Sequence, residues 1–267
     1  MKAIDIKELK VLQLEIMQSI HDFCIQNDIR YSISGGTLLG AVRHKGYIPW
    51  DDDIDCMMPR PDYEKFLRTF NRKESDFKVI SCYNNKSFYQ PFAKVINTKT
   101  ILIGSGDRKI QNLGVNVDVF PIDGLPNEEK NRKRYWNKIG KKKNFSSVIY
   151  TKFMPNEFWI KKIIRIILYC LFRPFPANWY AKKLHKIAMK NSFENSIFVA
   201  NSIFGYHTKE QMPKTLFDDF IPLDFENKSF LSIKNYHTYL SNLFGDYMQL
   251  PPKEKQIQKH DFEVFWR

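Results

Sequence analysis

Residues 33–63, ISGGTLLGAVRHKGYIPWDDDIDCMMPRPDY, constrain this chain more than any other stretch. The alternating apolar residues of 29–34 predict a strand with one buried face, and Gly35 and Gly36 then turn the chain. Thr37 and the good helix formers after it predict a helix over 38–43, whose first N–H groups face any bound anion. Four aspartates follow among the five residues 51–55. Because carboxylates bind hard cations, the stretch predicts a site for phosphate and Mg²⁺ together.

The acidic run is predicted to be a strand over 53–55, since Ile54 and the following Cys-Met-Met are apolar. Alternate side chains of a strand share a face, so Asp53 and Asp55 point the same way, about 7 Å apart. Asp51 joins them if the strand begins early. A solvated loop or a helix cap is the alternative interpretation. Like charges on one strand face repel unless a cation neutralises them, which favours a metal site for Mg²⁺, with Mn²⁺ as a substitute.

A third carboxylate stands in residues 114–120, GVNVDVF, which predict the strongest strand of the chain. The three valines face one side, whereas Asn116, Asp118 and Phe120 face the other. An aspartate inside a β-branched run is costly unless it is paired or bound to a metal. We therefore expect Asp118 to join the site, the alternative being an edge residue that faces water. A turn is sufficient to explain Asp123.

Residues 36–55, GTLLGAVRHKGYIPWDDDID, resemble the signature of the LicD phosphotransferases, a bacterial group that includes phosphocholine transferases and is broadly related to the fukutin-related proteins. The resemblance extends more weakly to residues 92–96, 117–123, 244–248 and 251–252, and to His260. It implies a nucleotidyltransferase-type fold. It also implies that a substituted phosphoryl group moves from a CDP-alcohol to a sugar hydroxyl.

The resemblance and the motif together give a set of expected site residues. Asp53, Asp55 and Asp118 are the expected catalytic residues, and the expected metal ligands are these three and Asp51. The expected substrate contacts are Gly35, Gly36, Thr37, Arg43, Lys94 and His260. Of these, Lys94 and His260 rest on the resemblance, since a strand lysine can also reach out to solvent and a histidine near a terminus is normally exposed.

The expected donor is a CDP-alcohol, with CDP-choline favoured over CDP-ribitol and CDP-glycerol, and the expected acceptor is a glycan or a lipid-linked oligosaccharide. One alternative uses the same site to attack the α-phosphorus of a nucleoside triphosphate and releases pyrophosphate. Another, from a different class, is a membrane-docking scaffold on a degenerate transferase body. The intact Asp53, Asp55 and Asp118 disfavour degeneracy.

The expected fold class is α/β (α+β), a nucleotidyltransferase-like mixed sheet with flanking helices and a basic helical insertion. Residues 1–126 form the predicted catalytic core, 127–190 the insertion or cap, and 191–267 a C-terminal part that completes the active site. The remaining periodicity predicts helices over 4–26, 60–70, 178–190 and 236–247, and strands over 77–82, 91–96 and 198–200. Gly245 is expected to end the last helix.

Charge sets residues 130–190 apart. They hold 17 Lys or Arg and one acid, a net +16, whereas the rest of the chain holds 25 basic and 28 acidic residues, a net −3. A helix is expected from Glu128 until Lys141–Lys143 break into a mobile loop over 144–147. A second helix, 157–172, carries Lys161, Lys162, Arg165 and Tyr169 on one stripe among many isoleucines.

Three roles compete for this segment: a packed cap, a contact with an anionic membrane surface, and nucleic-acid binding. The isoleucine-rich helix disfavours nucleic acid, so a cap that also contacts the membrane is expected. The four cysteines show no metal spacing and no disulfide framework. No signal peptide and no apolar run of roughly 18 residues is present. These features predict a cytoplasmic protein with a peripheral position on the cytoplasmic membrane face.

Overall fold

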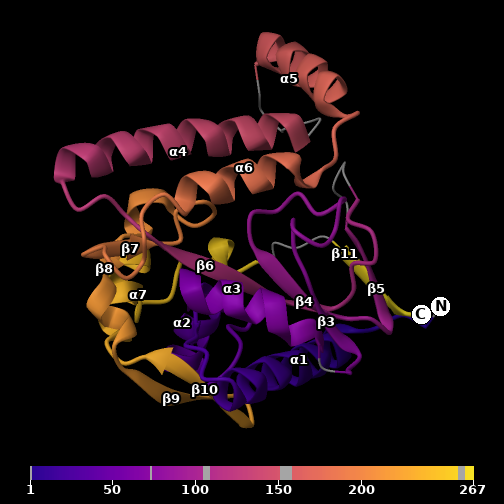
Figure 1. The fold of residues 1–267 in the computed structure, drawn as a ribbon. Helices are drawn as coiled ribbons and strands as arrows, with labels where there is room; N and C mark the ends of the chain where they lie inside the picture. The colour runs from indigo at the N-terminus through magenta and orange to yellow at the C-terminus, as the bar shows by residue number, and fades with distance from the viewer. Residues whose placement is uncertain (1, 73, 105–108, 151–157, 258–261) are drawn as a thin grey trace.

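A mixed seven-stranded sheet forms the centre of the computed structural model, which describes residues 2–72, 74–104, 109–150, 158–257 and 262–267 (Figure 1). Its main path runs β1-β2-β6-β4-β3, and β7 and β8 extend it from β6. Only the β2–β6 pair is parallel among these neighbours. The strands are β1 (Ser32–Ile33), β2 (Asp55–Pro59), β3 (Phe77–Ile80), β4 (Ala93–Asn97), β6 (Asn116–Gly124), β7 (Phe198–Ala200) and β8 (Met212–Pro213). The expected fold class is confirmed.

Two helices flank the sheet, α1 (Ile6–Gln26) and α3 (Arg60–Thr69), close to their expected bounds. The Asp5 side chain caps α1 by accepting a hydrogen bond of 2.8 Å from the Glu8 amide. Aromatic rings join them: the Phe23 centroid of α1 lies 5.9 Å from Phe66 of α3 and 5.0 Å from Phe70, which directly follows α3. The helical spacing of apolar residues predicted that one face of α1 is buried, and the structure confirms it.

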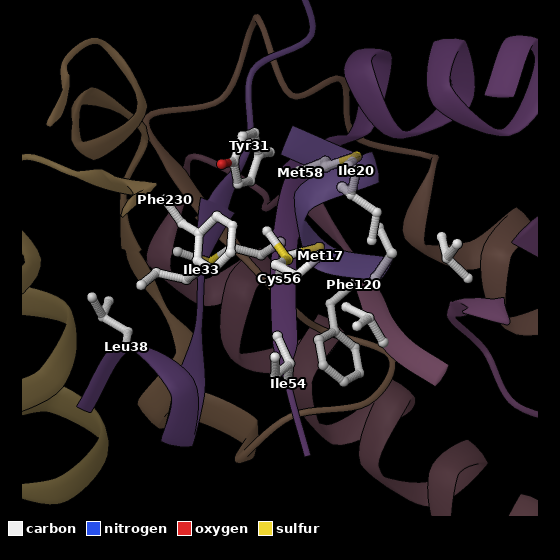
Figure 2. Packing of buried hydrophobic residues seen from close by; sticks show 14 of the residues in the cluster. Met17, Ile20, Tyr31, Ile33, Leu38, Ile54, Cys56, Met58, Phe120 and Phe230 are labelled. Carbon is white, nitrogen blue, oxygen red and sulfur yellow. The ribbon is translucent and has the colours of Figure 1, made fainter. Parts of the chain in front are cut away.

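The main core gathers side chains from segments far apart in the sequence (Figure 2). Met17 from α1, Cys56 from β2 and Phe230 from β10 are almost fully buried there. Burying each large apolar side chain contributes on the order of 2 kcal/mol. The core extends to α2 (Gly35–His44), α7 (Tyr236–Phe244) and the hairpin of β9 (Phe220–Phe225) and β10 (Lys228–Ile233). Gly245 caps α7 with φ +71°, as expected.

A separate two-stranded sheet brings the chain ends together (Figure 1). It consists of β5 (Thr100–Gly104) and β11 (Phe262–Trp266), which pair antiparallel. The Ile4 amide donates to the Val264 carbonyl at 2.9 Å, so the first residues lie beside the last strand.

The basic insertion forms α4 (Glu129–Tyr150), α5 (Trp159–Phe172) and α6 (Asn178–Ala188). The break predicted at Lys141–Lys143 is wrong, because α4 continues through it. Tertiary packing explains the difference: the Phe145 ring lies 5.2 Å from Tyr180 of α6, and Ile149 is buried in a second, smaller core. Weak helix formers such as Asn144 and the two serines stay helical because that packing outweighs their low helix propensity.

Helix α5 projects beyond α4, away from the sheet (Figure 1). A purely packed cap would turn Ile163, Ile166 and Ile167 inward, but the exposed fractions of Ile163 and Ile167 are 48% and 58%, and Ile166 is half-buried. Arg165 and Tyr169 are buried instead, and an Arg165 Nη1 donates to the Ser147 carbonyl at 3.2 Å. Among the helices in the described parts of the chain, none is long and apolar enough to cross a membrane.

Candidate active site

Strand register brings two of the predicted carboxylates together. In the parallel β2–β6 pair, Asp55 stands opposite Asp118, so neighbouring strands present an aspartate at the same level. Both side chains line a cavity of about 730 Å³, called the main cavity below because the predicted carboxylates lie in it. Burial, followed by the charges of Asp53 and Asp118, raises the pKa of Asp55 well above its ordinary value. A cation beside this carboxylate would offset the cost of its charge.

The predicted strand over 53–55 is wrong at its first residues, since β2 begins at Asp55. Asp53 lies in the preceding loop but still lines the main cavity. Backbone contacts hold this loop: the Asp55 amide donates to Thr37 Oγ1 at 2.8 Å, and the Asp118 amide donates to the Ile54 carbonyl at 3.0 Å. Asp53 and Asp55 therefore share a cavity because of this loop, not because of strand alternation.

The glycine pair and the carboxylates lie against each other, as the motif predicted. A Cβ built at Gly36 would stand 2.7 Å from Asp51 Oδ2, so a larger residue at this position would displace the carboxylate. A Cβ at Gly35 would lie 3.5 Å from Asp55 Oδ2, and the φ of +52° there also favours glycine. Only small residues let carboxylates approach the N-terminus of α2 this closely.

Lys94 of β4 stands opposite Asp118 in the antiparallel β4–β6 register. Its ammonium donates to Asp118 Oδ1 and, at 2.9 Å, to Asn116 Oδ1. Lys94 therefore does not reach out to solvent: its exposed fraction at the side chain is 12%. It supplies positive charge inside the main cavity, next to the carboxylates.

The donor set has the oxygen chemistry that Mg²⁺ prefers. Asp53, Asp55 and Asp118 line the main cavity, and Asp51 lies beside Gly36. Within the described residues, however, no three His, Cys, Asp or Glu side chains gather closely enough to hold one metal ion. The carboxylates thus fit a divalent cation by their chemistry, but their present spacing does not form a complete ligand set, and the Lys94 ammonium pairs with Asp118.

A second cavity, of about 590 Å³, adjoins the first. The two share the residues Gly36, Asp53, Asp55 and Tyr206, so the carboxylates stand at the junction. The second cavity is lined by aromatic, proline and polar side chains that include Arg43, Trp50, Asp51, Phe244, Asp246, Tyr247, Pro251 and Pro252. Segments 36–55 and 244–252, which carry the family resemblance, therefore meet in one place.

The remaining residues predicted to contact substrate lie in different places relative to the two cavities. Arg43 lines the second cavity, but its Nη1 donates to the carbonyls of Tyr247 at 3.0 Å and Gln249 at 3.4 Å, so it also holds that loop in place. Thr37 is buried behind the cavity wall, where its hydroxyl accepts from the Asp55 amide. Gly35 lies on the wall. His260 lies outside the described residues.

Sequence reasoning missed the segment 201–210, which lines the same cavity as the carboxylates. Phe204, Tyr206 and Glu210 line the main cavity. Burial raises the pKa of Glu210 to about 7, and its Oε1 accepts from the Tyr206 amide at 3.1 Å. An aromatic-glycine-aromatic triplet at 204–206 is the signal that was available, but nothing in the spacing tied it to residues 150 positions earlier.

Lys143 of α4 also reaches the main cavity from the insertion. Its ammonium donates to the carbonyls of Phe204 and Gly205, and burial lowers its pKa. Tyr239 of α7 lines the same cavity, and its hydroxyl accepts from the Gly35 amide at 3.4 Å. Residues from all three expected parts of the chain therefore contribute to one site.

Comparison with known proteins places this site in a family. The model of the LicD/FKTN/FKRP nucleotidyltransferase domain matches residues 28–158. The lipopolysaccharide cholinephosphotransferase LicD of Haemophilus influenzae is 32% identical over 269 residues, which cover 99% of each chain. The chain belongs to the LicD family. An uncharacterized protein of Rickettsia typhi is 50% identical over 75 residues, 27% of this chain and 24% of its own. The chain is thus a LicD-type phosphotransferase, as its signature predicted.

Proposed function

We propose that this LicD-family enzyme transfers phosphocholine from CDP-choline to a hydroxyl of a cell-surface glycan and releases CMP. The main observation that supports this proposal is that two cavities meet at Asp53 and Asp55. An in-line displacement at phosphorus needs the leaving group and the attacking hydroxyl on opposite sides of the reacting atom. Two adjoining cavities with the charged residues at their junction suit a donor on one side and an acceptor on the other. The name of the Haemophilus relative supports choline as the alcohol.

In this mechanism the chain acts through positioning and charge. Asp53, Asp55 and Asp118, with Asp51, would draw closer together to hold Mg²⁺, which would supply Lewis-acid stabilisation of phosphate charge when bound. The backbone N–H groups at Gly35 and Gly36 would hold a phosphate at the start of α2. Lys94, already beside Asp118, would offset the charge that develops as the bond to CMP breaks.

Asp118 is our candidate to orient or deprotonate the acceptor hydroxyl. Its carboxylate lies in the main cavity and is held from one side by Lys94, which leaves a defined direction for the second Oδ atom. If this is correct, Asp118→Ala abolishes transfer while CDP-choline binding, followed by calorimetry, weakens much less than in Asp53→Ala. Turnover that survives in Asp118→Ala with only a loss of stability would leave the residue a purely structural role.

One release assay tests the proposed reaction. The purified protein is incubated with Mg²⁺, a lipopolysaccharide acceptor and CDP-choline, CDP-ribitol, CDP-glycerol or a nucleoside triphosphate. The proposal predicts acceptor-dependent CMP from CDP-choline. Pyrophosphate from a triphosphate would support the nucleotidyltransferase alternative, and no release from any donor would support the scaffold alternative. Asp55→Asn serves as the inactive control, and Asp219→Asn, an exposed aspartate outside both cavities, serves as the matched active control.

We further propose that α5 brings the enzyme to an anionic bilayer on the cytoplasmic face, where a lipid-linked acceptor is presented. Ile163, Ile164, Ile167 and Leu171 are each 48–60% exposed, which is unusual for an apolar stripe on a helix. The surrounding 130–190 segment carries the net +16. An apolar face flanked by basic residues matches an anionic lipid surface in both chemistry and charge.

A further inference from the structure

The junction between the two cavities includes one aromatic side chain. Of the four residues that the cavities share, Gly36, Asp53 and Asp55 belong to the phosphate and metal motif, and the fourth is Tyr206. In a group transfer, the moiety that moves is bonded first to the donor and then to the acceptor. It must therefore be held at the junction, and its alcohol lies within a few bonds of the reacting phosphorus.

Tyr206 is held in place by its neighbours although its ring is 61% exposed. Its amide donates to the buried Glu210 carboxylate at 3.1 Å. Gly205 precedes it with φ +20°, and a Cβ there would lie 2.5 Å from Glu210 Oε1, so the chain winds tightly around this carboxylate. The ring meets Phe244 of α7 edge-on at 6.2 Å. An exposed ring on a backbone fixed this firmly is available for a ligand.

Phe204, two residues earlier, places a second ring on the same wall. It stacks on Phe120 of β6 with centroids 5.4 Å apart and planes 12° apart, yet remains 43% exposed. Phe120 neighbours Asp118 by two residues on β6, so this ring pair lies beside the carboxylates. The two exposed rings therefore present aromatic faces on one wall of the main cavity, and such faces attract a cation.

We propose that Tyr206, with Phe204 beside it, binds the trimethylammonium head of the transferred group through cation–π contact. This rests on the proposed function, and it assigns the choice of alcohol to the 204–206 segment. A quaternary ammonium has no N–H to donate, so ring faces and electrostatic attraction are the means of recognising it. Ribitol and glycerol, by contrast, need hydrogen-bond partners, which the faces of aromatic rings do not provide.

A neutral isostere of the donor isolates the charge. Choline and 3,3-dimethylbutanol have the same shape, but the latter carries carbon in place of the cationic nitrogen. We would compare kcat/KM for CDP-choline with that for CDP-3,3-dimethylbutanol in the unmodified enzyme, Tyr206→Phe and Tyr206→Leu. The proposal predicts that Tyr206→Phe keeps the preference for CDP-choline and that Tyr206→Leu reduces it on the order of tenfold. Tyr83→Leu, an exposed tyrosine outside both cavities, should leave it unchanged.

Calorimetric binding of the same two donors gives a readout that does not depend on turnover, and thermal unfolding shows that each variant is folded. Equal losses for both donors in Tyr206→Leu would overturn the proposal and leave Tyr206 a positioning residue. Failure of the unmodified enzyme to release CMP from CDP-choline would instead overturn the proposed function. In that event the binding preference between the two donors, and its loss in Tyr206→Leu, still decides whether the subsite recognises the cation.

Discussion

A buried ion pair between Arg60 and Asp123 carries the largest single-site effect that we expect on stability. Arg60 Nε donates to Asp123 Oδ1 at 2.6 Å and Nη2 donates to Oδ2 at 2.8 Å, a two-bond fork. The exposed fractions of the two side chains are 8% and 0%. Burial alone lowers the pKa of Arg60, but the charge of Asp123 and its hydrogen bonds outweigh this and raise it. Glu64 and His185 complete the contacts of the guanidinium.

Asp123→Asn keeps the size of the side chain but removes the fully buried counter-charge of the guanidinium and leaves it the partly exposed Glu64, at 3.2 Å. Breaking such a pair costs about 3–5 kcal/mol, which corresponds to a fall in Tm on the order of 10 °C for a chain of this length. Urea unfolding measures the free energy of unfolding directly. Asp219→Asn is the control: Asp219 pairs with Lys234 at 3.4 Å, both are 63–70% exposed, and we expect a change below about 0.5 kcal/mol.

The double variant Arg60→Met/Asp123→Leu distinguishes the cost of an unpaired buried charge from the cost of altered packing. Because it removes both charges together, it should recover much of the lost stability or even exceed the unmodified protein. A loss below about 1 kcal/mol in Asp123→Asn would refute the reasoning, since it would mean that solvent already screens the pair. A paired variant no more stable than Asp123→Asn would refute it as well, because the cost would then lie in packing.

Three further predictions use other parts of the chain. Asp55→Asn should leave the protein folded but reduce transfer by several orders of magnitude, and normal turnover in saturating Mg²⁺ would remove Asp55 from the metal ligands. Burial, followed by Arg60, lowers the pKa of His185 well below 6.5, so the unfolded chain takes up the proton first; urea unfolding should show stability falling as the pH drops below about 6.5, with a flatter slope in His185→Gln. Flotation with anionic vesicles at physiological salt should recover the unmodified protein, whereas replacing Lys141, Lys161 and Lys162 by Gln should release it; no flotation of the unmodified protein would refute membrane docking.

Most elements of the fold could be predicted because their signals are local. The helical spacing of α1 and the alternation in β6 survive into the structure with bounds shifted by a few residues. The errors arise where tertiary contacts decide. Alternation cannot distinguish a strand from an extended loop, so β2 was placed two residues early. Lys141–Lys143 resemble a helix end in isolation, yet packing on α6 carries α4 eight residues past Lys142.

Only part of the candidate site could be predicted from the sequence. The carboxylates of the motif at 33–63 could be predicted because the aspartates are neighbours in the sequence and share one chemistry. The contribution of residues 201–210 was not predictable, because Tyr206 and Glu210 join the site only through their place beside residues about 150 positions away. Asp123 shows the same limit. In the sequence a turn was sufficient to explain this aspartate. In the structure it is a buried residue of β6 whose partner, Arg60, lies 63 residues earlier.

The Arg60–Asp123 pair also connects stability to the site, because it lies at the far end of the β2–β6 pairing from the carboxylates. The register of β2 and β6 runs from Asp55 opposite Asp118 to Pro59 opposite Ile122. The next residues are Arg60, which begins α3, and Asp123 of β6, about 16 Å along the strands from the carboxylates. A slip of one residue between the strands would turn Asp55 away from Asp118 and break the ion pair at the same time. The pair thus fixes the level at which the carboxylates meet, and His185 of α6 binds Arg60, so the basic insertion is anchored at the same point. Molecules of Asp123→Asn that remain folded should therefore lose transfer activity as well as stability.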